Sequence, residues 1–164
     1  MYRVLGDFHP EASIPQLITR TLLVAGEEMP FAPPGRDYSP KQAENLRVEL
    51  ATTPEEPIAG VLAQLLVTLG PSEGIEPLMG AWGHMLAASD DLIDMIHTHP
   101  VPADGGPQMR FSLVFPRART YRVWLQFQRG GVVNTAHFDI PVREMPVGPL
   151  LAADSPDDST ERGR

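Results

Sequence analysis

The chain has 164 residues, of which 42% are hydrophobic, and a formal net charge of −8. This length and apolar content suit one domain with a real core plus additional segments. The acidic balance argues against a nucleic-acid-binding protein, which would concentrate Lys and Arg, and against docking on anionic lipid. The sequence has no cysteine, which excludes disulfides, thiolate zinc sites and a blue-copper cysteine ligand.

No apolar run approaches the roughly 20 residues that a membrane-spanning helix needs. The start, from Met1 to Val4 and then Gly6 and Asp7, lacks the apolar stretch of a signal peptide. We therefore expect neither a membrane span nor an export signal in this sequence.

Residues 1–25 repeat a pattern found later in the chain. The two copies, at a constant offset, are Tyr2-Arg3-Val4…Phe8 and Tyr121-Arg122-Val123…Phe127. A turn and a second apolar segment follow each copy, at residues 18–24 and 136–142. We expect residues 1–25 to form a hairpin laid out like the last two strands of a sandwich. Because an isolated hairpin is marginally stable, it either docks on an edge of residues 45–143 or completes a domain that begins outside this sequence.

Two segments look irregular. Residues 26–44 include the run Met29-Pro30-Phe31-Ala32-Pro33-Pro34-Gly35, which is too broken for regular structure and indicates a linker. Residues 144–164 combine prolines with acidic and small polar residues. Such a composition buries too little apolar surface to fold, and we expect a disordered acidic tail.

Residues 45–143 alternate between apolar and polar residues with a period of two, which is typical of half-buried strands. The expected strands cover residues 46–50, 61–69, 84–88, 92–99, 111–115, 121–127 and 136–142. About seven short strands, without a convincing helical period, predict an all-β fold: an immunoglobulin-like antiparallel β-sandwich. The expected core includes Phe111, Leu113, Phe115, Val123, Leu125, Phe127, Phe138 and Ile140.

Tyr121 opens a strand directly after a turn, as in a tyrosine corner, where the phenol bonds to the upstream backbone. The alternative is that Tyr121 is simply a good strand former. The acidic residues Asp90, Asp91 and Asp94 suggest acid–base chemistry or calcium binding. The adjacent pair Asp90-Asp91 lies where a hairpin turn is expected, however, and a calcium loop would need a longer pattern of oxygen ligands, so we interpret the pair as turn formers.

Three histidines, His84, His97 and His99, lie within sixteen residues. Residues two apart on a strand share a face, so His97 and His99 should point the same way. Counted from a turn at residues 89–91, His84 should lie opposite His97. Neutral imidazoles bind copper and zinc well, and three of them leave an open coordination position. The alternative is a polar end of the sheet with hydrogen-bonded imidazoles.

Other residues near the histidines have two interpretations each. The thioethers of Met85, Met95 and Met109 suit Cu(I), although methionine commonly fills cores. Trp82 lies in a glycine-flanked loop. It either contacts a ligand or partner, or fills the core of the sandwich. Trp124 points outward by strand parity, which suggests packing against a partner or the N-terminal hairpin. We find no nucleophile motif and no nucleotide-binding glycine pattern, and expect no enzyme.

Several motifs in order carry a resemblance to a known family. They are Glu76-Pro77-Leu78-Met79-Gly80-Ala81-Trp82-Gly83-His84, Asp91-Leu92-Ile93, His97-Thr98-His99-Pro100, Phe111…Phe115-Pro116 and Tyr121-Arg122-Val123-Trp124-Leu125-Gln126-Phe127-Gln128. Together they resemble a bacterial family of secreted, membrane-anchored β-sandwich proteins related to the YtkA-like and copper-resistance (CopC-like) accessory domains.

The resemblance implies an immunoglobulin-like sandwich, often in tandem copies, at the periplasmic or outer face of a membrane. Carried over residue by residue, it makes His84, His97 and His99 the positions of interest. We expect copper, or alternatively zinc, as the cofactor, and another β-sandwich domain or an envelope protein as the partner. The expected function is a non-catalytic binding module that holds a copper-type metal or assists metal handling. The alternative is a structural or protein-interaction sandwich without a metal.

Overall fold

The computed structural model describes residues 1–8, 16–26, 34–101 and 104–146. Every regular element in these ranges is a strand: β1 (Tyr2–Phe8), β2 (Gln16–Leu22), β3 (Lys41–Gln42), β4 (Arg47–Thr53), β5 (Leu62–Gly70), β6 (Ile75–Glu76), β7 (His84–Ser89), β8 (Met95–Thr98), β9 (Gln108–Val114), β10 (Thr120–Arg129) and β11 (Val132–Pro141). In this described part of the chain, no helix has the length and apolar character to cross a membrane.

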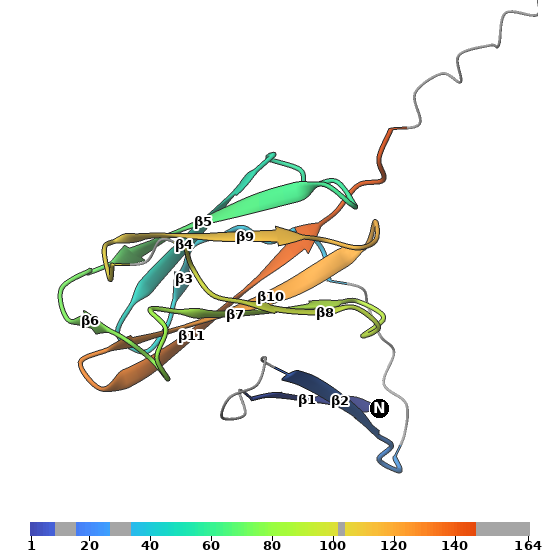
Figure 1. The fold of residues 1–164 in the computed structure, drawn as a ribbon, viewed down its shortest axis with the longest axis horizontal. Helices are drawn as coiled ribbons and strands as arrows, with labels where there is room; N and C mark the ends of the chain where they lie inside the picture. Colours follow the sequence, from blue (N-terminus) through green and yellow to red (C-terminus); the bar gives the residue numbers. More distant parts are fainter. Residues whose placement is uncertain (9–15, 27–33, 102–103, 147–164) are drawn as a thin grey trace, which may run out of the picture.

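Nine of the strands form two facing sheets (Figure 1). One sheet has the order β11-β10-β7-β8, with β6 also pairing with β10, and the other has the order β3-β4-β5-β9. Every pairing between these strands is antiparallel. The predicted all-β antiparallel sandwich is therefore confirmed, while its immunoglobulin-like character stays a prediction.

The core between the two sheets follows from the period-two pattern. In β9, buried and exposed residues alternate without exception. All eight side chains predicted for the core are buried, and none exposes more than 5% of its surface. Sequence parity alone thus identified the inner face of β9, β10 and β11, because each strand packs one face on the opposite sheet and leaves the other outside.

The turn between β7 and β8 is wider than predicted. The Ser89 amide donates to the Asp94 carbonyl at 3.0 Å, and the Leu92 amide donates to the Ser89 carbonyl at 2.8 Å. Leu92 adopts a positive φ of 58°, which breaks strand geometry. As a result β8 begins at Met95 rather than at Leu92, and its register with β7 moves by two residues.

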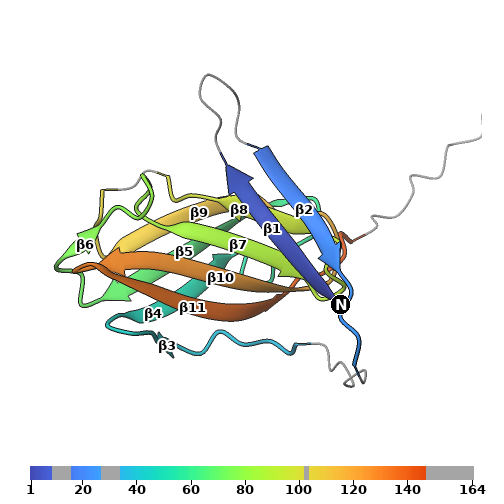
Figure 2. The ribbon, with the colours of Figure 1, turned by 90° about the horizontal axis from the view of Figure 1, so that it is seen from below.

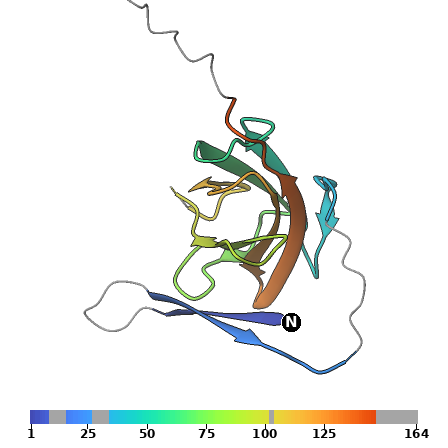
Figure 3. The ribbon, with the colours of Figure 1, turned by 90° about the vertical axis from the view of Figure 1, so that its right-hand side faces the viewer.

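β1 and β2 form a separate two-stranded antiparallel sheet, the N-terminal ribbon, in which Tyr2 lies opposite Leu22. Figures 1 and 3 show it beside the β11-β10-β7-β8 sheet rather than within either layer, and Figure 2 shows it crossing that sheet obliquely. The Arg3 Nε donates to the Leu92 carbonyl at 3.1 Å. The ribbon therefore lies on the outer face of the sandwich and supplies none of its core.

The linker and tail are described only in part. Residues 27–33, which hold most of the predicted linker, and residues 147–164, which hold most of the predicted disordered tail, lie outside the described residues. Within the remainder, Asp37 pairs with Asp139 through backbone hydrogen bonds of 2.9 and 3.1 Å, and β3 pairs with β4. The chain thus joins the sandwich before residue 45, where the sequence placed its start.

Candidate metal centre

The three histidines of the predicted site come together on one sheet. His84 is the first residue of β7, His97 lies within β8, and His99 follows the end of β8. Leu86 is the residue directly opposite His97, so His84 lies diagonally from His97 on the same face. The predicted direct pairing of His84 with His97 is wrong by two residues because of the wider turn. The face was predicted correctly, since a shift of two residues preserves strand parity.

A tight turn places the backbone group that orients His84. Leu78 and Ala81 exchange backbone hydrogen bonds of 2.8 and 3.0 Å around Met79 and Gly80, whose φ angles are 49° and 87°. Two consecutive positive φ angles are the signature of a type I′ turn, for which glycine is strongly preferred. The Leu78 carbonyl thereby accepts a hydrogen bond of 2.8 Å from His84 Nε2.

Gly83 brings the start of β7 close to the core. A Cβ atom at this position would lie 2.5 Å from Cε1 of Phe127 and 2.8 Å from its Cδ1. Only glycine allows this approach without displacing the ring. The Gly-His pair at residues 83 and 84 therefore has a packing cause, and it fixes where the imidazole of His84 leaves the strand.

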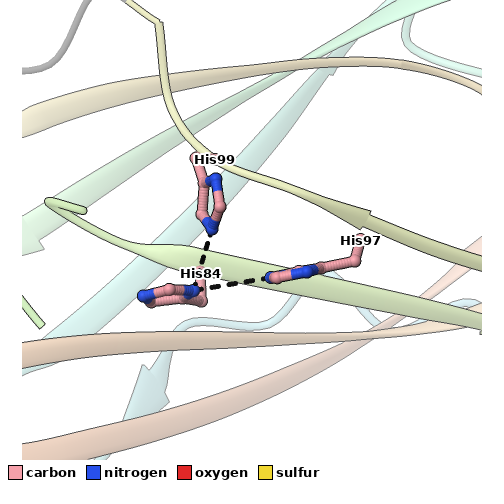
Figure 4. Close-up of side chains that lie close together, drawn as sticks. All are labelled: His84, His97 and His99. Carbon is pink, nitrogen blue, oxygen red and sulfur yellow. Dashed lines mark hydrogen bonds between the residues drawn. The ribbon is translucent and has the colours of Figure 1, made fainter. Parts of the chain in front are cut away.

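The imidazoles converge on Nδ1 of His84 (Figure 4). His99 Nε2 lies 3.0 Å from this nitrogen, and His97 Nε2 lies 3.4 Å from it. The ring of His97 stacks on that of His84 with 5.6 Å between centroids, and the ring of His99 meets both nearly at right angles. One ligand atom from each residue lies within 4.8 Å of those from the other two.

The hydrogen bond to Leu78 decides the tautomer of His84. A carbonyl oxygen can only accept, so Nε2 of His84 carries the proton and Nδ1 of the neutral ring presents a lone pair. Two further ring nitrogens approach that single lone pair. A ring whose other nitrogen donates to a backbone carbonyl is the usual arrangement of a metal-ligating histidine, because the outer hydrogen bond fixes both tautomer and orientation.

The spacing of the nitrogens fits a small metal ion. Two nitrogens at about 2.0–2.1 Å from a common ion lie about 2.9 Å apart at a right angle and about 3.4 Å apart at the tetrahedral angle. The observed separations of 3.0 and 3.4 Å fall at these two values. The three ligand atoms together lie within 4.8 Å of one another, and two nitrogens bound to one ion can be at most about 4.2 Å apart. His84 Nδ1, His97 Nε2 and His99 Nε2 could therefore hold a copper or zinc ion after the rings of His97 and His99 close toward each other, and they would leave a coordination position open.

A cavity of about 650 Å³ adjoins His84 and His97. The ribbon forms one wall with Met1, Tyr2, Arg3 and Leu5, and the outer face of the sheet forms the other. The remaining lining residues are Met79, Leu86, Ala88, Leu92, Met95, Trp124, Gln126 and Thr135. Trp124 therefore points outward from the sheet, as predicted, and faces the ribbon across the cavity.

The other candidates from the sequence lie apart from the three imidazoles. Trp82 is half-buried and packs against the core, and its ring would lie only 2.3 Å from a Cβ on Gly105, which favours its role as a plug. Met85 and Met109 are buried core residues, as expected of methionines that fill space. Met95 alone of the three methionines lines the cavity. A further histidine, His137, is exposed on β11 and does not belong to the cluster.

The acidic residues of the β7–β8 turn form a polar network that the sequence did not reveal. Arg117 donates to Asp91 at 2.9 Å and to Asp94 at 2.7 Å. The Tyr121 phenol donates to Asp94 at 2.8 Å and accepts from the Arg117 amide at 3.3 Å. The predicted contact of Tyr121 with the upstream backbone is thus present, but its shorter bond is to a carboxylate on another strand pair.

The network shifts the ionisation of its members. Hydrogen bonds from Arg117 hold the pKa of Asp91 well below its ordinary value of 3.8. Burial raises the pKa of Tyr121, and the hydrogen bond to Asp94 raises it further. Because these carboxylates are already paired with arginines, their position supports the turn rather than a calcium site or acid–base chemistry.

Comparison with known proteins adds a family but no activity. A family model described as "Domain of unknown function (DUF8832)" matches residues 41–144. These bounds agree with the sandwich, since the match begins at β3 and ends just after β11. No curated protein matches the chain.

Proposed function

The chain belongs to the DUF8832 family, a family of unknown function, and from the geometry of the site we propose that its sandwich is a non-catalytic module that binds a copper-type metal ion. The ligands are His84 Nδ1, His97 Nε2 and His99 Nε2. Zinc is the alternative ion, because both metals accept neutral imidazole. The sequence resemblance to the YtkA-like and CopC-like accessory domains, which points to metal handling at the cell envelope, supports the same proposal.

One observation carries this proposal: the orientation of His84. Its Nε2 is held by the Leu78 carbonyl while its Nδ1 faces the other two histidines. A purely structural cluster needs only one donor for that lone pair, whereas a bound ion uses all three nitrogens. The non-catalytic assignment rests on the carboxylates of the β7–β8 turn, which are paired with Arg117 and Arg119 rather than left as acids or bases.

The competing proposal is a structural or protein-interaction sandwich without a metal. The half-buried Trp124 favours it, since this side chain lies on the outer face of the sheet against the cavity under the ribbon. In that case the three imidazoles form hydrogen bonds with one another at a polar end of the sheet and bind no ion.

Calorimetric titration with Cu(II), Cu(I) and Zn(II) separates the two proposals. We expect a micromolar or tighter Kd for at least one ion, and a loss of at least about 10-fold in both His84→Ala and His97→Ala. His137→Ala is the matched control, because this exposed histidine on β11 lies outside the cluster, and it should bind as the wild type does. A wild-type Kd no tighter than about 1 mM for every ion would leave the structural proposal.

A further inference from the structure

The outer face of the N-terminal ribbon is apolar and exposed. Tyr2, Val4 and Phe8 alternate in β1 with Arg3 and Leu5, which line the cavity. Tyr2 also touches the rim of the cavity, but 63% of its surface is exposed. The register of the ribbon adds residues from β2 to the same face. We call this surface the ribbon face, and it consists of Tyr2, Val4, Phe8, Ile18, Leu22 and, just beyond β2, Val24. Exposure of these side chains runs from 40% at Ile18 to 64% at Val24.

The ribbon face corresponds to a buried face elsewhere in the chain. Tyr2, Val4 and Phe8 match Tyr121, Val123 and Phe127 of β10, which are completely buried. The pairing also corresponds, because Tyr121 lies opposite an aliphatic residue of β11 just as Tyr2 lies opposite Leu22. The ribbon thus has the side chains of a core-facing strand pair, but no second layer of the described chain covers them.

The size of this surface fits an interface. At roughly 200 Å² for a fully exposed large apolar residue, the six residues expose on the order of 600 Å². That is the upper end of the largest apolar patch on a typical monomer, and such patches often mark interaction sites. A two-stranded ribbon on its own is also marginal in water, so a covering layer would stabilise it.

We propose that the ribbon faces of two copies of this chain pack on each other in a homodimer. A twofold axis pairs one patch with itself, so a single apolar face suffices for both partners. Two such faces bury about 1,200 Å² in total, which reaches the range of specific interfaces. Arg20 lies opposite Val4 within the face. Its guanidinium can stack on the Tyr2 ring of the second copy, as arginine and tyrosine commonly do at interfaces.

Sedimentation equilibrium tests the dimer on the full chain. We expect a dimer at about 50 µM, and a rise of at least about 10-fold in the dimer Kd for Val4→Asp, since a carboxylate would be buried without a partner. Val114→Asp is the matched control, because Val114 on β9 is 46% exposed and Val4 is 47% exposed. A wild-type monomer at this concentration, or a dimer unchanged by Val4→Asp, would overturn the proposal.

Cross-linking covers the case in which an aspartate merely unfolds the ribbon. The chain has no cysteine, so a single introduced thiol can form only an intermolecular disulfide. We place the twofold axis at Val4, between Tyr2 and Phe8 on the ribbon face, so that the two Val4 positions meet across it. Val4→Cys should then cross-link to a covalent dimer under mild oxidation much faster than Val114→Cys. Equal rates for the two variants would show that the ribbon faces do not meet. The dimer and the metal site are independent, because no proposed ligand lies in the ribbon.

Discussion

Gly83 packs against the core and directly precedes His84 of the candidate site. Gly83 lies so close to Phe127 that an added methyl group would overlap the ring. Gly83→Ala should therefore lower the free energy of unfolding by about 1–3 kcal/mol, as overpacking usually does. Phe127→Ala should cost about 3–5 kcal/mol, because it leaves a cavity in a fully buried site.

The two changes should not be additive. The space left by Phe127→Ala can accept the methyl group of Gly83→Ala, so the double variant should lose less stability than the sum of the two single variants. Denaturant unfolding of all four proteins measures this coupling. Strict additivity would mean that β7 does not approach the Phe127 ring as closely as the structure indicates.

At the scale of elements, the turn at residues 78–81 orients His84 without supplying a ligand atom. Gly80 has a φ of 87°, which a β-branched residue adopts only with strain, although no atom lies within 4 Å of a Cβ there. Gly80→Val should displace the Leu78 carbonyl and weaken metal binding by about 10-fold, as loss of an outer hydrogen bond to a ligand does.

Gly130 provides the control for this prediction. It also has a positive φ, 55°, and open space around its Cβ, but it lies in the β10–β11 turn. Gly130→Val should lose a similar amount of stability, about 1 kcal/mol, and leave metal affinity unchanged. Thermal unfolding of both variants measures the stability lost to backbone strain, and titration calorimetry measures the change in metal affinity. Equal metal affinity in the two variants would contradict the orienting role of Leu78.

The β7–β8 turn should make stability depend on pH. The pKa of Asp91 lies below its ordinary value of 3.8 in the folded protein, chiefly because Arg117 donates to it. The folded state therefore binds fewer protons than the unfolded state near that pH. The stabilisation is present above about pH 4 and is lost as the pH falls toward the folded-state value.

Asp91→Asn removes this contribution. Its unfolding free energy should be lower than that of the wild type by about 1 kcal/mol at pH 7, a modest value because the pair is partly exposed. The difference between the two proteins should shrink below pH 4. Glu49→Gln, at an exposed position on β4, serves as the control. A difference that stays constant from pH 7 to pH 2 would show that the loss is one of packing rather than of charge.

Strand parity explains what the sequence could predict. Alternation places Phe111, Val123 and Phe138 inside because every second residue shares a face, whatever the pairing partner. It likewise placed His97 on the face of His84. The sequence could not reveal that Ser89 bonds to Asp94 and widens the turn, because that depends on a side chain and a left-handed residue acting together.

Sequence patterns also do not identify which backbone group accepts a hydrogen bond from a site residue. The carbonyl of Leu78 orients the candidate site, yet a carbonyl is common to every residue and has no signature of its own. The glycine at position 80 was the available signal, since it marks the turn that presents this carbonyl. The contacts of Asp94 with Arg117 and Tyr121 join segments far apart in sequence, so no local spacing predicts them.

At the scale of the whole molecule, the ribbon and the sandwich form separate hydrophobic units. Every buried core residue of the described chain lies between Leu46 and Val142, and the family match likewise starts at residue 41. Deletion of residues 1–26 should therefore leave one cooperative unfolding transition. Metal affinity should stay within about threefold of the intact chain, because none of the three histidines is removed.

The same deletion should change the environment of one tryptophan only. Trp124 lines the cavity that the ribbon closes, whereas Trp82 packs against the core and Gly105. Without residues 1–26, emission should shift to longer wavelength and quenching by iodide should increase, because the indole of Trp124 becomes hydrated. In a Trp124→Phe background the deletion should change neither signal. A shift that persists in that background would mean that the ribbon also shields Trp82, and loss of the cooperative transition would mean that the sandwich needs the ribbon to fold.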